Sequence, residues 1–141
     1  MKAEKVDTMD LTSGLIAEFH VATARADLLV DSERLSSVAT AIIRAADVVA
    51  LGPPLLASVP IEPDLVGTPD DDGGLTLLQP LTTSHLAIHT WPAQGRARVV
   101  LDVCVPFEVE RIARLLENAL EAHVVARSRE YRDLMFPEVH A

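Results

Sequence analysis

The 141-residue chain has few of the residues that mark several common classes of protein. It holds a single cysteine, Cys104, so an internal disulfide is impossible and a zinc site of several thiolates is excluded. Three phenylalanines, one tryptophan and one tyrosine offer little surface for stacking on bases. With 21 acidic and 12 basic residues, the net charge of −9 repels phosphate backbones. We therefore expect no nucleic-acid partner.

Long apolar runs are also missing. No run reaches the ~18 apolar residues that a membrane helix needs, and the charged first ten residues lack the apolar region of a secretory signal. We expect a cytoplasmic, soluble protein with no membrane partner. Hydrophobic residues make up 49% of the chain, and its length suits one domain over residues 1–141.

The hydrophobic pattern predicts two helices and a set of strands. A helix is expected over about 25–46, with an apolar stripe from Leu35 to Ala46, and a second begins at Pro106. Strands are expected over 14–21, 48–51, 55–59, 75–81, 84–90, 96–103 and 124–126, followed by a polar tail. Two helices can cover only one face of such a sheet. The predicted fold class is α+β, a two-layer α/β sandwich with a mostly antiparallel sheet.

A proline-rich insertion interrupts this pattern over residues 52–74. Its five prolines and the acidic run Asp70–Asp72 predict a long exposed loop, because proline removes backbone donors and fixes φ. Such a loop is either a lid or binding loop, or a solvated surface insertion, and we favour the surface insertion.

Polar residues gather from Thr82 to Trp91, within a predicted strand. A single strand histidine or cysteine is usually structural, but Ser84, His85 and His89 lie together, and Cys104 follows twenty residues after Ser84. Ser84 and His89 are an odd number of residues apart and so point to opposite faces of a regular strand. If they act together, a bend or bulge must separate them, or Ser84 must lie beyond the regular strand.

The segment from Ser84 to Pro92, read as Ser-His-x-x-Ile-His-Thr-Trp-Pro, resembles the self-processing motif of the small bacterial S-adenosylmethionine decarboxylases. Cys104 stands where that family carries its catalytic cysteine, and Thr76 stands where it usually carries a processing serine. The resemblance extends from about Leu15 to Asp133, apart from the proline-rich insertion.

This resemblance implies a pyruvoyl-dependent decarboxylase that cuts its own chain. Ser84 would attack the carbonyl of Thr83, the chain would break between them, and Ser84 would become a pyruvoyl group that takes the substrate amine as a Schiff base. His89 would transfer protons during processing, Thr76 would polarise the peptide, and Cys104 would return a proton to the substrate Cα. We expect His89 to face Cys104 and Thr76. His85 is expected to support this site or to be structural.

The resemblance also implies a substrate and a quaternary structure. Family members act in polyamine synthesis as homodimers of cleaved protomers. Glu18 and Trp91 are candidate substrate-binding residues, and no metal is expected.

Departures from the family pattern leave the substrate open. Thr83 replaces a glutamate, Ala93 replaces the glutamate expected to hold the ribose of S-adenosylmethionine, and the insertion offers no aromatic residue for adenine. S-adenosylmethionine is favoured, with arginine or ornithine as the alternative, since Glu18 or Asp70–Asp72 would suit a cationic group.

Two further interpretations stay open. The chain would be a non-catalytic, unprocessed homologue that acts as a binding subunit if the departures matter more than the motif. A metal site of His85, His89 and Cys104 is disfavoured, because the two histidines lie ~13 Å apart on an extended strand.

Overall fold

A computed structural model describes residues 14–58, 73–82 and 84–131 of the chain. Ten elements follow one another there: β1 (Gly14–Thr23), η1 (Ala26–Val30), α2 (Ser32–Ala46), β2 (Leu55–Ser58), β3 (Leu75–Leu81), β4 (Ser84–Trp91), η3 (Pro92–Gln94), β5 (Arg96–Val103), α3 (Val109–Leu120) and β6 (Ala122–Tyr131).

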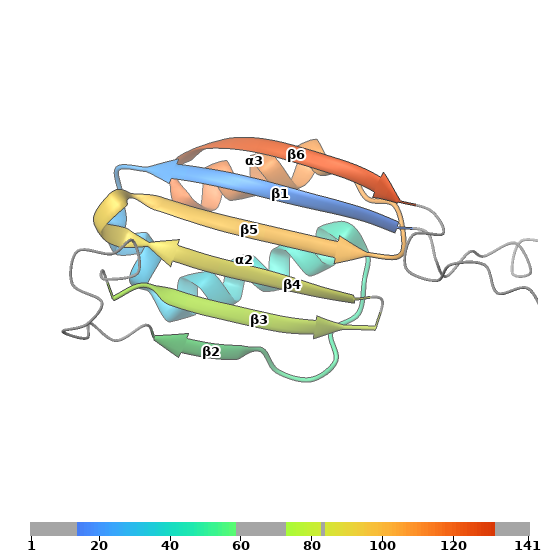
Figure 1. Cartoon of the computed structure of the whole chain (residues 1–141). Helices are drawn as coiled ribbons and strands as arrows, with labels where there is room; N and C mark the ends of the chain where they lie inside the picture. The colour runs from blue at the N-terminus through green and yellow to red at the C-terminus, as the bar shows by residue number, and fades with distance from the viewer. Residues whose placement is uncertain (1–13, 59–72, 83, 132–141) are drawn as a thin grey trace, which may run out of the picture.

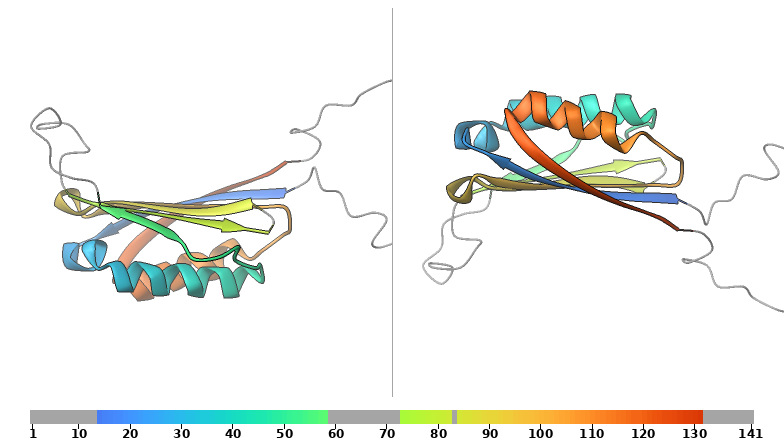
Figure 2. Two further views of the ribbon diagram at one scale, coloured as in Figure 1. Left: turned by 90° about the horizontal axis from the view of Figure 1, so that it is seen from below. Right: turned by 90° about the horizontal axis from the view of Figure 1, so that it is seen from above.

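The strands form one six-stranded sheet in the order β2-β3-β4-β5-β1-β6, and every neighbouring pair is antiparallel. Both α-helices lie on one face of this sheet, as the edge-on views show (Figure 2). The other face, called the open face below, is turned toward the viewer in Figure 1. The predicted two-layer α+β sandwich is confirmed.

The core lies between the sheet and the helices. Alternate residues of β1, among them Phe19 and Val21, are buried, as period-two strands require. The apolar stripe of α2 meets them from the other layer, with Leu35 and Ile42 fully buried. Asp31 caps α2 by accepting a hydrogen bond from the backbone N–H of Arg34 at 3.1 Å.

Four predicted boundaries are wrong. The segment 25–46 is a short 3₁₀ helix followed by α2, because Asp31 ends one and caps the next. Residues 48–51 contribute a single bridge, Ala50 with Leu81, instead of a strand. Helix α3 begins at Val109, after the proline rather than on it. The last strand runs on to Tyr131, since β1 pairs with it throughout.

The proline-rich insertion is described only at its two ends. The predicted strand near residue 55 is present as β2, the exposed edge strand beside β3. Residues 59–72, with Asp70–Asp72, lie outside the described part of the chain. Within the described ranges, neither helix is long and apolar enough to cross a membrane.

Candidate active site

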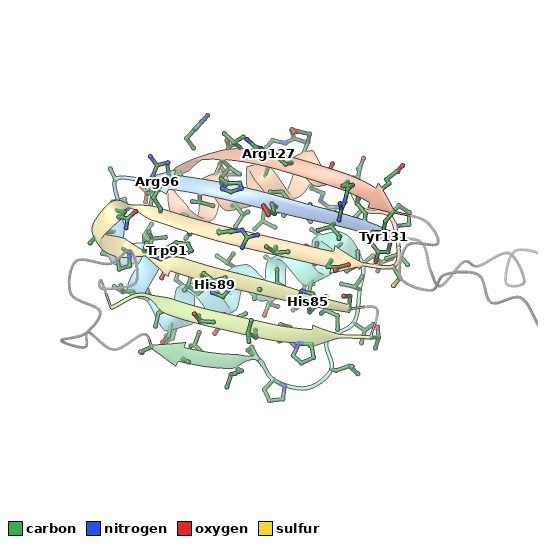
Figure 3. All side chains as sticks on the ribbon, in the orientation of Figure 1. His85, His89, Trp91, Arg96, Arg127 and Tyr131 are labelled. Carbon is green, nitrogen blue, oxygen red and sulfur yellow. The ribbon has the colours of Figure 1, made fainter. Side chains whose placement is uncertain are left out.

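The open face carries most of the polar residues that the sequence singled out. Cross-strand neighbours share a face, so the register places Thr76, His89 and Arg98 side by side, and likewise His85 and Asp102. Figure 3 shows His85, His89 and Trp91 along β4 on this face. The face also has more basic than acidic side chains, although the chain as a whole is acidic: its arginines on β5 and β6 are Arg96, Arg98, Arg127 and Arg129.

Thr76 and His89 form a direct pair. Oγ1 of Thr76 lies 3.2 Å from Nδ1 of His89, across the β3–β4 ladder. Partial burial lowers the pKa of His89, and the neighbouring Arg98 guanidinium lowers it further. The imidazole is therefore neutral at neutral pH and can accept a proton. The ring of Trp91 lies next along the strand, with its centroid 6.3 Å from that of His89.

Ser84 begins β4 at the other end of the strand. Its φ of +155° is one that residues with a side chain rarely adopt. Its Oγ lies 3.1 Å from Nδ1 of the adjacent His85. Thr83, the other residue of the expected cleavage site, lies outside the described residues. The β5 partner of Ser84 is Val103, so Cys104 follows at the same end of the sheet.

These two groups of residues are far apart within one chain. Strand β4 pairs in step with β3 and β5 from Ser84 onward, so the expected bend or bulge before His89 is absent from it. On an extended strand the five-residue separation of Ser84 and His89 is about 16 Å. The structure thus brings His89 to Thr76 and places Cys104 near Ser84. It does not bring His89 to Cys104.

Glu18 is already paired. It lies on the open face of β1, and its Oε1 accepts a hydrogen bond from Nη2 of Arg98 at 2.6 Å. His20 approaches the other carboxylate oxygen at 3.4 Å. The Arg98 hydrogen bond is the main cause that holds the pKa of Glu18 below its ordinary value. The carboxylate is therefore ionised and occupied by an internal guanidinium.

Sequence reasoning missed Tyr131, which lies close to Cys104. Its hydroxyl donates a hydrogen bond to Oδ1 of Asp102 at 3.2 Å, and its ring is buried at the end of β6. Tyr131 and the half-buried Cys104 line the same cavity of about 470 Å³. The only signal would have been the register of β6 on β1, which a predicted strand of three residues does not provide.

A metal site finds no support in this geometry. Across residues 14–58, 73–82 and 84–131, no three His, Cys, Asp or Glu side chains gather closely enough to hold an ion. His85 and His89 point to the same face, but they lie four residues apart on an extended strand, about 13 Å, which is too far for both to bind one metal ion.

Comparisons with known proteins indicate the family and the fold of the chain. The family model described as S-adenosylmethionine decarboxylase matches residues 14–133. The crystal structure of the adenosylmethionine decarboxylase from Aquifex aeolicus VF5 superimposes with a TM-score of 0.66 at 21% sequence identity, covering 92% of this chain and 98% of that chain. No curated protein matches the chain in sequence. The structural likeness shows a shared fold.

Proposed function

Because the chain belongs to the S-adenosylmethionine decarboxylase family, we propose that it is a self-processing, pyruvoyl-dependent decarboxylase of polyamine synthesis whose substrate is S-adenosylmethionine. One observation carries this proposal. Ser84, at a rarely adopted φ and with its hydroxyl on an imidazole, begins the strand that holds His89 against Thr76.

The residues around Ser84 fit a pyruvoyl group made from it. The hydroxyl that must attack the Thr83 carbonyl lies against Nδ1 of His85, and the unusual φ belongs to the residue directly after the peptide bond to be broken. Cys104, the only thiol, follows the strand paired with Ser84. Once formed, the group supplies an electron sink for loss of carbon dioxide from an amino acid.

Each side chain then has a limited task. Ser84 is the nucleophile of processing, His85 orients its hydroxyl, and the thiol of Cys104 is the proton donor at the substrate Cα. The neutral imidazole of His89, hydrogen-bonded to Thr76, takes and returns protons during processing.

The distance between His89 and Ser84 supports the homodimer. About 16 Å separates them in one chain, too far for a proton transfer that needs hydrogen-bond contact. A second copy, related by a two-fold axis at the end of the sheet where Ser84 begins β4, would present its own Thr76–His89 pair to the Ser84 hydroxyl, which reaches His85 of the open face. We propose that each site takes Ser84 and Cys104 from one protomer and Thr76 and His89 from its partner.

S-adenosylmethionine is preferred over arginine and ornithine on one structural ground. Glu18, the carboxylate that would have received a guanidinium or ammonium group, is taken up by Arg98 at 2.6 Å. An internal cation in that position leaves little gain for a cationic substrate. Ala93, exposed after Trp91 and Pro92, still lacks the carboxylate expected for a ribose, so substrate affinity is expected to be modest.

Release of labelled carbon dioxide tests the proposal. Purified protein is incubated with carboxyl-labelled S-adenosylmethionine, arginine or ornithine, and the Ser84→Ala variant is the control. We expect release from S-adenosylmethionine alone, and none from the variant. Release from arginine or ornithine instead would correct the substrate. No release from any of the three by a fully cleaved chain would reject the decarboxylase.

A further inference from the structure

The last described residue of β6 lies beside the proposed proton donor. The cavity of about 470 Å³ at this end of the sheet is lined by Cys104 and Tyr131, together with Gly14, Val105, Pro106 and Glu130. Cys104 is the only cysteine of the chain, and Tyr131 is the only tyrosine. Figure 3 shows Tyr131 at the end of β6, on the side where β5 also ends.

Tyr131 is held from two sides. Its hydroxyl donates to Oδ1 of Asp102 at 3.2 Å, and only 6% of the residue is exposed although it ends an edge strand. Its ring lies over Gly14, its partner in the β1–β6 register. A Cβ at Gly14 would overlap the phenol oxygen, so only glycine leaves room for this placement.

Because the phenol O–H is donated to Asp102, only the lone pairs of the phenol oxygen remain for a hydrogen bond with Cys104. Burial raises the pKa of Tyr131 well above its ordinary value, and Asp102 and Cys104 raise it further. The phenol therefore stays protonated and donates its one O–H in a hydrogen bond to Asp102. Its oxygen keeps lone pairs, and the thiol is a weak donor that can use one of them.

We propose that Tyr131, held by Asp102 and Gly14, accepts the S–H of Cys104 and is a positioning residue for the thiol that returns the proton to the substrate. The inference rests on the proposed function, which makes Cys104 the proton donor. Asp102 acts through Tyr131, and neither side chain touches the reacting carbon.

The contact itself is tested without activity, in the uncleaved Ser84→Ala background. Because Tyr131 is the only tyrosine, the ultraviolet absorbance of phenolate during a pH titration reports on it alone. We expect Asp102→Asn and Cys104→Ala each to lower the titration midpoint of the phenol, because each change removes a neighbour whose negative charge disfavours the phenolate. We also expect Tyr131→Phe to alter the rate at which iodoacetamide alkylates Cys104 by severalfold. An unchanged midpoint in Cys104→Ala, together with an unchanged alkylation rate in Tyr131→Phe, would overturn the proposal.

The functional step is tested in the cleaved enzyme. Tyr131→Phe keeps the ring that packs on Gly14, so we expect normal processing, an unchanged KM and a kcat lowered roughly tenfold, the worth of about one hydrogen bond. Ser128→Ala, an exposed change on the same strand, should leave kcat unchanged. Full kcat in Tyr131→Phe would reject the positioning role and leave the decarboxylase intact. A chain that is never cleaved would reject the proposed function, while the phenol titration would still decide whether Tyr131 meets Cys104.

Discussion

Oγ1 of Thr76 lies 3.2 Å from Nδ1 of His89, in a pair that spans two neighbouring strands of the open sheet face. The residue on which this pair is proposed to act, Ser84, begins the same strand as His89 at the far end of the sheet. The separation of about 16 Å is too long for a proton transfer within one protomer, so the proposed site depends on how two protomers assemble.

Complementation between two inactive variants tests a site shared by two protomers. Ser84→Ala removes the nucleophile and His89→Ala removes the imidazole, so neither variant alone should be cleaved. In a mixed dimer, Ser84 of the His89→Ala chain would meet His89 of the partner subunit. Co-expression should therefore restore cleavage of the His89→Ala chain, seen as its two fragments on a gel.

The control for this experiment is co-expression of Ser84→Ala with itself, carried on two tags, which should yield no fragments. If His89→Ala stays whole in the mixture although the two chains co-purify, the site lies within one protomer. The shared arrangement would then be wrong.

The pH dependence of processing should follow His89. Burial and the Arg98 guanidinium lower the pKa of His89 below the ordinary value of 6.5. The imidazole is therefore neutral and active at pH 6.5 and above, and the cleavage rate should fall only in more acidic solution. Arg98→Gln removes the positive neighbour, which raises the pKa of His89 and moves the fall in rate to higher pH. Arg96→Gln, opposite Trp91, is the matched control and should leave the profile in place. A profile that Arg98→Gln does not move would exclude His89 as the titrating group.

Ala93 gives a test of the substrate. Introducing the carboxylate that family members carry, by Ala93→Glu, should lower KM for S-adenosylmethionine by roughly tenfold through one charged hydrogen bond to the ribose. Gln94→Glu adds the same charge to the neighbouring exposed residue and should leave KM unchanged. Equal effects of the two variants would point to charge alone and count against a ribose contact at residue 93.

Thr90 ties the site strands together. Its buried Oγ1 accepts a hydrogen bond from the backbone N–H of Leu75 at 2.8 Å, where β3 begins beside the end of β4. Thr90→Val keeps the shape but leaves that N–H unpaired, which should lower the free energy of unfolding by about 1–3 kcal/mol. Thr40→Val, on the exposed side of α2, should cost much less. Urea unfolding at one protein concentration measures both, and equal costs would contradict the assigned role of the Thr90 hydroxyl.

The fold was predictable where one side of an element is apolar. The alternation of β1, β3 and β5 reports a buried face, so these strands were found near their true bounds, and the α2 stripe gave the end of that helix at Ala46 but not its start at Ser32. Strand β6 was predicted far too short, because after Val125 its side chains are mostly exposed and polar. Pairing with β1, a contact distant in sequence, extends it to Tyr131.

The residues of the candidate site could be predicted from the sequence, but the contacts between them could not. The polar cluster and its resemblance to a family motif singled out Ser84, His89 and Cys104, and strand periodicity placed Ser84 and His89 on opposite faces. That His89 meets Thr76 follows from the β3–β4 register, which no local pattern specifies. The partner of Glu18 was equally hidden, because Arg98 reaches it from β5, eighty residues along the chain.

The most direct test of the central claim is the mass of the purified protein under denaturing conditions. Self-processing at the bond before Ser84 predicts two fragments of 83 and 58 residues, the second blocked at its N-terminus by a pyruvoyl group, and a single intact chain for Ser84→Ala. An intact 141-residue chain after prolonged incubation of the unsubstituted protein would contradict the account.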